Sequence, residues 1–323
     1  MDKTKSEGAW LNDVKAALSR EKLPIKALET AAKAKKLNPT LSGDLADNFT
    51  GYQNRQAGWA DASKAMIQLG GDCIEAGVSF ICGAAGTVRG FNADPKGRIR
   101  SIRSLANTMV NGDFFILAAG AWTSSLVPMY NSTLSTAQVL GYVQPSDEEM
   151  HTLKDLPIYT SFSTEWFNFP PHEDTRTLKM AVYGWGYTRK PNAGEISGDH
   201  VNDSAPVTRP QRSRPDFVPK DDRPFEKLAI CWYTDTGTGD FIMDLHPDYS
   251  NVFVATGGSG HAFKFLPVLG QYIVKAMEKQ LPSELAQKWQ FRTEYKHESG
   301  FTGDGSRAGP ARRELRSEER ARL

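Results

Sequence analysis

Residues 251–265 read Asn251-Val-Phe-Val-Ala-Thr-Gly-Gly-Ser-Gly-His-Ala-Phe-Lys-Phe265, and this stretch decides the fold. Its first six residues form the continuous apolar run of a buried strand. Gly257–Gly260 follow as a tight turn, and the apolar spacing over Phe265–Lys279 predicts a helix. A strand, a glycine-rich turn and a helix in this order direct backbone N–H groups toward an electron-rich ligand. The alternative is a plain strand-to-helix connection, and a full G-x-G-x-x-G is absent because Phe263 stands at the third glycine.

A second α/β pattern lies earlier in the chain. Apolar residues recur every three or four positions over 59–76, which predicts an amphipathic helix that ends at Gly77. Val78–Cys82 follows and predicts a strand. Asp113–Ala119 is a continuous apolar run of strand length, which favours a strand covered on both faces in a parallel sheet. Ligands of such sheets lie beyond the carboxyl ends of the strands.

The middle of the chain has a different pattern. Ser146–Glu149 is a capping box that starts a short helix. Strands joined by short links indicate an antiparallel sheet, and therefore a second domain. Residues 188–225 are rich in Pro, Asp, Ser and Arg, which predicts an exposed and partly disordered loop. The expected strands are Ala137–Gln144, Pro157–Thr164, Trp166–Phe169 and Leu178–Tyr183.

The composition excludes several classes of protein. The 323 residues are 39% apolar and 24% charged, and the formal net charge is +1. This balance argues against wholesale disorder, and against nucleic-acid or membrane binding driven by bulk charge. No apolar run has the length of a transmembrane helix, and the polar opening shows no secretory signal. Residues 1–50 are expected to be helical and mostly polar, with Lys15–Lys36 rich in good helix formers.

Three single residues carry possible chemistry, each with a plain structural alternative. Lys264 lies in the first helical turn after the glycines, where a cation suits an anion or a developing negative charge; the alternative is a solvated lysine. His261 is assigned a backbone role only. Cys231 precedes Trp-Tyr-Thr-Asp-Thr, and it is either a low-pKa thiolate in a cleft or a buried free thiol.

At these residues the chain resembles the flavin-dependent amine oxidases of the D-amino-acid-oxidase superfamily. It is most similar to the fungal branch of monomeric sarcosine, fructosyl amino acid, saccharopine and pipecolate oxidases. The resemblance runs from about Asn54 to Pro310. The segments that carry it are Ala57–Ala62, Asp113–Thr123, Cys231–Thr236, Asn251–Phe265 and Gly303–Pro310.

The resemblance implies bound FAD, joined covalently through Cys231. It implies that Gly258, Ser259, Gly260 and His261 line the flavin pyrimidine, and that Lys264 lies near flavin N5 and the substrate carboxylate, where it helps dioxygen react. The remaining residues that it implies are Val88, Gly120 and Trp122 for the adenine half of the cofactor, and Phe167, Lys179 and Tyr183 for the face toward the substrate.

The implied reaction is oxidation of the C–N bond of a secondary amino acid to an imine, with dioxygen reduced to hydrogen peroxide. The implied partners are therefore a small-molecule amine and dioxygen. The chain departs from the family in three respects. No glycine-rich pyrophosphate loop precedes Asn54. Tyr183 stands where relatives often carry His, and Ala262 stands where they often carry Gly. Two interpretations stay open: an oxidase of this family, or a truncated and inactive remnant that does not hold FAD.

The expected fold class is α/β: an incomplete FAD-binding Rossmann-like domain and an antiparallel-sheet substrate domain. The final Ala321-Arg322-Leu323 fits the tripeptide that the peroxisomal import receptor binds, with a cytoplasmic location as the alternative. The expected division is an N-terminal helical segment (1–55), two parts of the FAD-binding domain (56–135 and 236–310), a substrate domain (136–235) and a tail (311–323).

Overall fold

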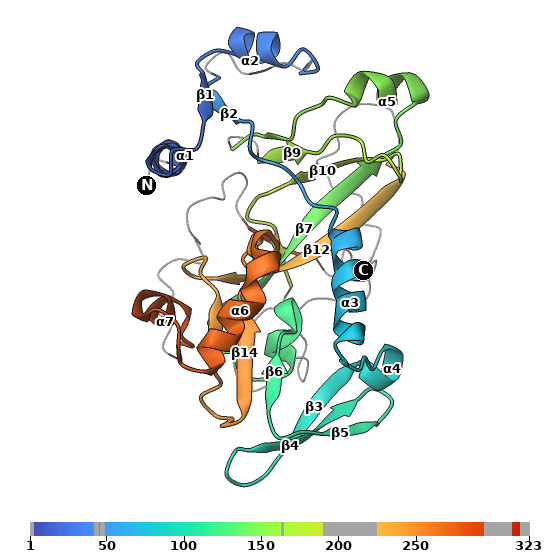
Figure 1. Cartoon of the computed structure of the whole chain (residues 1–323), viewed down its shortest axis with the longest axis vertical. Helices are drawn as coiled ribbons and strands as arrows, with labels where there is room; N and C mark the ends of the chain where they lie inside the picture. The colour runs from blue at the N-terminus through green and yellow to red at the C-terminus, as the bar shows by residue number, and fades with distance from the viewer. Residues whose placement is uncertain are drawn as a thin grey trace.

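The computed structural model describes residues 3–41, 45, 49–162, 165–189, 225–293 and 312–316, with side chains described from residue 11 onward. Figure 1 shows an α/β body at one end of a long antiparallel sheet, with a small N-terminal unit at the upper left of the view. The expected mixed α/β fold is confirmed. The expected tail (311–323) can be compared only over 312–316, because 294–311 and 317–323 lie outside the described residues.

The N-terminal unit is not wholly helical, so that expectation is wrong. Helices α1 (Lys3–Arg20) and α2 (Ala31–Leu37) flank a strand, β1 (Ile25–Leu28). This strand pairs antiparallel with β2 (Gly51–Asn54). Pro24 disfavours helix at the residue before it, and Ile25–Leu28 then finds a partner strand that propensity alone cannot reveal.

The α/β body is built around residues 251–265. Strand β14 (Val252–Thr256) lies between β13 (Ile242–Leu245) and β6 (Phe115–Leu117), and it runs parallel to β6 with Val252 opposite Phe115. The expected helix is confirmed as α6 (Leu266–Met277), preceded by the short helix η2 (Ala262–Phe265) and followed by α7 (Ser283–Trp289). The core around this sheet comprises Ile99, Leu117, Val127, Met129, Ile242, Val252 and Val254.

One side of this body is open, against the expectation that the 113–119 strand is covered on both faces. Leu117 is buried, but Phe114 is 45% exposed and Ile116 is 51% exposed. Helix α3 (Ala62–Glu75) has the expected apolar spacing and ends before Gly77, yet none of its residues is buried. Helix α6 likewise has no buried residue. The apolar pattern therefore identifies these elements correctly, while within the described residues nothing covers their outer faces.

A second small sheet was not expected from the sequence. Strands β3 (Val88–Ala93), β4 (Ile99–Ser104) and β5 (Met109–Asn111) form an antiparallel meander after the four-residue helix α4 (Gly83–Gly86). The predicted strand Val78–Cys82 is wrong, because this segment is irregular and exposed, with Phe80 at 56%. An apolar run without a partner strand cannot satisfy its backbone groups as a strand, and the pairing begins ten residues later instead.

The large antiparallel sheet is the longest feature of the molecule. Strand β7 (Thr133–Val143) pairs from Thr133 to Tyr142 with the whole of β12 (Lys227–Thr236). On its other edge β7 pairs with β10 (Leu178–Val182) and β11 (Tyr187–Thr188). The sheet continues through β9 (Trp166–Asn168) to β8 (Tyr159–Thr160), and β15 (Arg313–Glu314) adds to β11.

Most of the expected middle strands are confirmed, although Pro157–Thr164 yields only the two residues of β8. The capping box is confirmed at the start of α5 (Asp147–Leu153), where the Ser146 and Glu149 side chains each accept from the other's backbone N–H. Thr188, the first residue of the expected loop, belongs to β11 instead, and residues 190–224 lie outside the described residues.

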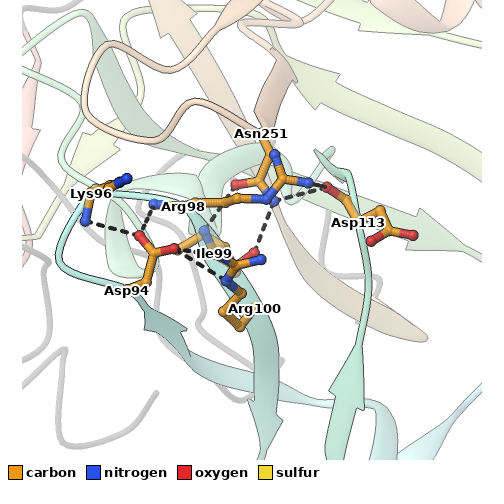
Figure 2. Close-up of polar contacts among 7 residues, drawn as sticks. All are labelled: Asp94, Lys96, Arg98, Ile99, Arg100, Asp113 and Asn251. Atoms are coloured by element: carbon orange, nitrogen blue, oxygen red, sulfur yellow. Dashed lines mark hydrogen bonds and ion pairs between the residues drawn. The ribbon is translucent and has the colours of Figure 1, made fainter.

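A buried asparagine joins the small sheet to the α/β body. Asn251, 2% exposed, precedes β14, and its amide accepts from the Ile99 N–H at 2.8 Å. The same side chain donates to the carbonyl oxygens of Ile99 (2.8 Å) and Asp113 (2.9 Å), as Figure 2 shows. In the adjacent turn, the Asp94 carboxylate accepts from the N–H groups of Lys96 and Arg98. Three segments distant in sequence are thus fixed through one side chain.

Replacing Asn251 with alanine is expected to lower the free energy of unfolding by about 2–4 kcal/mol, because buried backbone groups lose their partners. Urea unfolding followed by circular dichroism measures the change. Asn92→Ala is the matched control: this exposed amide donates to Ser101 Oγ at 3.0 Å, and its loss is expected to cost under about 1 kcal/mol. Equal effects of the two substitutions would contradict this role of Asn251.

Candidate functional site

The register of the large sheet brings three of the predicted site residues toward one surface. Cys231 pairs with Gln138, and Lys179 pairs with Tyr142, four residues further along β7. Because side chains alternate between the two faces of a strand, Cys231 and Lys179 project from the same face. Phe167, opposite Ala181 on β10, projects from it as well. We call this surface, with Tyr142, Phe167, Lys179, Cys231 and Tyr233, the thiol face.

Electrostatic interaction couples the two reactive groups of the thiol face. Desolvation lowers the pKa of Lys179, and its ammonium lies 5.1 Å from the centre of the Phe169 ring. Desolvation raises the pKa of the Cys231 thiol, and the positive charge of Lys179 acts in the opposite direction. Cys231 is nevertheless solvent-accessible. The face therefore holds an accessible thiol beside a partly desolvated cation.

Aromatic rings form the walls beside Lys179. The Phe167 and Phe169 rings meet edge to face, with their centres 5.7 Å apart. Trp59, from the segment before α3, approaches Phe169 edge-on at 6.3 Å. The apolar spacing over 59–76 predicts Trp59 on a helix face, and no site role was predicted for Phe169. Their proximity depends on a contact between distant segments, for which single-residue patterns give no signal.

The glycine-rich turn packs against the thiol face. Gly257, Ser259 and Gly260 all have positive φ, at 77°, 47° and 78°. The Ser259 N–H donates to the Thr234 carbonyl oxygen at 2.9 Å, which ties the turn to β12. A Cβ atom on Gly260 would lie 2.7 Å from the Tyr233 ring, so only glycine permits this approach.

Tyr183 also reaches the turn. Its ring centre lies 6.3 Å from that of Tyr233, and a Cβ on Gly260 would meet it at 3.2 Å. The structure therefore brings together Cys231, Tyr183 and the predicted turn residues Gly258–His261. Tyr233 was missed in the sequence argument, although its position two residues after Cys231 on one strand is a signal that could have found it.

The carboxyl ends of the two parallel strands meet beside this turn. Thr256 Oγ1, at the end of β14, donates to the Gly120 carbonyl oxygen at 3.4 Å. Thr123 Oγ1, in the short helix η1 (Gly120–Ser125), donates to the same oxygen at 2.7 Å. Gly120 has positive φ, at 55°, and Trp122 remains 41% exposed. This edge is the place where ligands bind in open α/β sheets.

Two predicted residues lie away from the thiol face. Lys264 is exposed in η2, on the helical side of the turn. Val88 begins β3 and pairs with Ser104 in the small sheet. Among the described residues, no hydrogen bond, ion pair or ring contact joins either side chain to Cys231.

A cluster of charged side chains, which was not predicted from the sequence, surrounds the start of α3. Asp61 caps the helix by accepting from the Lys64 N–H at 3.1 Å, and it lies 3.0 Å from His172 Nε2. Lys64 forms ion pairs with Asp61 and Asp174. The hydrogen bond from Lys64 and that from His172 lower the pKa of Asp61. The cluster is satisfied by its own members, and it connects α3 to the turn before β10.

In the part of the chain that the structure describes, no helix combines the length and apolarity needed to cross a membrane. The final Ala321–Leu323 lies outside the described residues, so the structure does not test the import signal.

The model for the family of FAD dependent oxidoreductases called DAO matches residues 3–276, and the chain belongs to that family. The L-saccharopine oxidase of Schizosaccharomyces pombe is 28% identical over 291 residues, which cover 83% of this chain and 67% of that protein. A monomeric sarcosine oxidase of Bacillus sp. (strain B-0618) is 28% identical over 181 residues, covering 52% of this chain and 44% of that protein.

The fold is shared with a solved structure. Fructosyl amine: oxygen oxidoreductase (Amadoriase I) from Aspergillus fumigatus superposes with a TM-score of 0.78 at 26% identity. The match covers 90% of this chain and 68% of that chain. The chain thus spans about two thirds of the length of the saccharopine oxidase and of this amadoriase.

Replacing Lys179 with methionine is expected to slow alkylation of Cys231 by iodoacetamide about threefold at pH 8, and to move the midpoint of the rate-against-pH curve upward. The reason is that loss of the cation disfavours the thiolate. The measurement uses protein prepared without flavin, with Cys73 and Cys82 replaced by serine.

Lys227→Met is the matched control for this experiment. Its ammonium lies over Tyr142, at 5.5 Å from the ring centre, and does not contribute to the shift at Cys231. Equal slowing in both variants, or no slowing in Lys179→Met, would show that the proposed coupling is absent.

Proposed function

We propose that this protein oxidises the C–N bond of a secondary amino acid with FAD as its cofactor. The observation that carries the proposal is the convergence of the Cys231 thiol, the Lys179 cation and the Gly257–Gly260 turn on one face of the large sheet. Saccharopine, sarcosine and fructosyl amine oxidases are named among the similar proteins, and this supports an N-substituted amino acid as substrate.

The residues present fit the flavin end of FAD. Cys231 offers an accessible nucleophile for a covalent bond, and Gly258, Ser259, Gly260 and His261 form a backbone-lined turn next to it. Gly120 and Trp122, at the adjoining strand end, and Val88 are proposed to contact the adenine half. No strand–turn–helix with a G-x-G-x-x-G sequence, which would hold the pyrophosphate, occurs among the described residues. When bound, the flavin would accept the two electrons that C–N oxidation releases, as a hydride equivalent.

The side chains of the thiol face have separate proposed tasks. Among the described residues, no carboxylate contributes to the pKa shift of Lys179, so its ammonium can bind an anionic group of the substrate or stabilise negative charge on reduced dioxygen. The same positive charge disfavours a protonated amine nearby, which favours the neutral amine that reacts. Phe167 and Phe169 exclude water and contact the apolar part of the substrate.

Tyr183 and Lys264 have proposed tasks at the turn. Tyr183, beside Gly260 and Tyr233, holds the turn against the sheet and presents a phenol toward the same space. Lys264 places a second cation at the helical side of the turn, suited to a substrate carboxylate or to dioxygen as it gains charge. The proposed products are an imine, which water hydrolyses, and hydrogen peroxide formed from dioxygen.

A second candidate is a protein of the same fold that does not hold FAD. The observation in its favour is the open side of the α/β body, where α3 has no buried residue and Ile116 is 51% exposed. A cofactor site that borders an uncovered sheet edge lacks one of its walls. The two candidates differ in a single measurable property, the retention of flavin.

Acid precipitation of the purified protein tests the proposal. The expected result is a yellow, fluorescent pellet, because flavin bonded through sulfur survives denaturation. Cys231→Ser is expected to release the flavin into the supernatant, while the control Cys82→Ser, at another exposed thiol, retains it. A colourless protein that shows no spectral change with added FAD contradicts the proposal and favours the second candidate.

A further inference from the structure

A buried histidine lies at the end of the α/β body, and the proposed oxidation gives it no task. His246, 2% exposed, follows β13, and its Nε2 lies 2.8 Å from the Pro128 carbonyl oxygen. Its Nδ1 lies 3.1 Å from the Asp248 backbone nitrogen. A carbonyl oxygen only accepts and a backbone N–H only donates, so the two contacts require a neutral ring that carries its proton on Nε2.

Aromatic rings enclose this imidazole. The centres of the Tyr249 and Phe291 rings lie 4.9 Å and 5.2 Å from its own, and that of Tyr130 lies 6.4 Å away. Burial lowers the pKa of His246, because a charged ring would lose its hydration. A proton added at Nδ1 would also point at the Asp248 N–H. The folded structure therefore favours the neutral ring.

The charged and titratable groups near the ring come from three elements. The Asp248 carboxylate, in the turn after β13, favours the protonated ring, as does the bond to Pro128. This carboxylate also accepts a hydrogen bond from the Tyr130 hydroxyl, in the segment before β7. Asp244, on β13, accepts from the Phe291 N–H at 3.0 Å. The attraction of Asp248 is smaller than the effect of burial.

The turn that His246 begins packs against the small sheet over 88–111. A Cβ atom on Gly97, in the hairpin between β3 and β4, would lie 2.4 Å from the Asp248 carbonyl oxygen, so the two backbones are in contact. The turn leads into Asn251, whose side chain binds the backbone of Ile99 (Figure 2). The histidine thus supports the segment on which the small sheet rests.

We propose that His246 is an acid-sensitive latch, in which the neutral ring holds the turn over 246–250 against the small sheet and protonation at Nδ1 releases both. The proton comes from solvent. The bond from the Asp248 N–H is lost, while Nε2 keeps its proton and its bond to Pro128. The proposal goes beyond the proposed oxidation, because it concerns a joint of the fold that exists with or without cofactor.

The direction of the pH dependence follows from the two states of the ring. In the unfolded chain the imidazole has its ordinary pKa of 6.5, and burial lowers the pKa of His246 in the folded protein. The unfolded chain therefore binds more protons below pH 6.5, so the stability that His246 contributes is complete above this pH. Between pH 6.5 and the lower folded pKa, the folding equilibrium constant is expected to fall about tenfold per pH unit.

Histidine resonances and amide hydrogen exchange test the latch in the purified full chain. With ¹³Cε1-labelled histidine, the His246 signal is assigned, among those of six histidines, as the one lost in His246→Asn. Its midpoint is expected below pH 6.5. From pH 7.5 to 5.5, exchange corrected for its intrinsic rate is expected to rise at least about fivefold over 94–104 and 246–252. Exchange over 133–143 and 227–236 is expected to stay constant.

Two variants separate titration from structure. His246→Asn keeps an oxygen that accepts from the Asp248 N–H but does not titrate, so exchange in both segments is expected to lose its pH dependence. Asp248→Asn removes the charge that favours the protonated ring, so the midpoint of the His246 signal is expected to move to lower pH. The matched control is His151→Asn, at an exposed histidine on α5, which is expected to behave as the unmodified chain. Circular dichroism establishes that each variant is folded.

Three results would overturn the proposal. The first is a His246 signal that titrates at pH 6.5 or above. The second is an equal rise of exchange over 133–143 and 227–236, which would mean that acid loosens the whole molecule. The third is pH-dependent exchange that persists in a folded His246→Asn variant or, if that variant does not fold, an unmoved His246 midpoint in Asp248→Asn.

Discussion

The pairing of β7 with β12 is the constraint on which the rest of the molecule depends. It extends over ten successive residue pairs, from Lys227 opposite Tyr142 to Thr236 opposite Thr133. Its register decides which side chains share a face with Cys231. At one end it reaches the glycine-rich turn, because the Ser259 N–H donates to Thr234 and the Thr236 N–H donates to Ser259 Oγ. Strand β12 therefore joins the antiparallel sheet to the glycine-rich turn of the α/β body.

The same pairing gives the two sides of the sheet different properties. One side carries an accessible thiol, a partly desolvated cation and the turn at the carboxyl ends of β6 and β14. The other side carries an apolar cavity that Met180 and Leu228 help to line. A slip of one residue along β7 would exchange the two sets of side chains, so the chemistry of both surfaces depends on this register.

Long apolar runs and glycine signals made much of the fold predictable. The strand, turn and helix over 251–279, the end of α3 at Gly77 and the capping box at Ser146 all follow from local rules. The strand at Val78–Cys82 and the all-helical N-terminus were wrong, because whether a short segment forms a strand depends on a partner that may be distant in sequence. The small sheet over 88–111 was missed for the same reason, because its strands are rich in polar residues and alternate only weakly between apolar and polar positions.

Part of the candidate site, like part of the fold, could be predicted from the sequence. Cys231, Lys179, Phe167 and Tyr183 were selected through a family resemblance, and the register brings them to one region of the sheet, whereas Lys264 lies apart in η2. Phe169 and Trp59 were missed because their contact joins segments more than a hundred residues apart. Helix α3 and strand β6 each have an exposed apolar face. The chain covers about two thirds of the length of the amadoriase on which it superposes.

The register of β7 and β12 can be measured by cross-linking. In a variant with Cys73 and Cys82 replaced by serine, Gln138→Cys places a thiol directly opposite Cys231, at a spacing that a disulfide spans. Mild oxidation is expected to form this intrachain bond, detected as a linked peptide pair by mass spectrometry, whereas Val139→Cys on the reverse face is expected to form none. A bond at Val139→Cys and none at Gln138→Cys would mean that the strands are paired differently, and both surfaces would have to be reassigned.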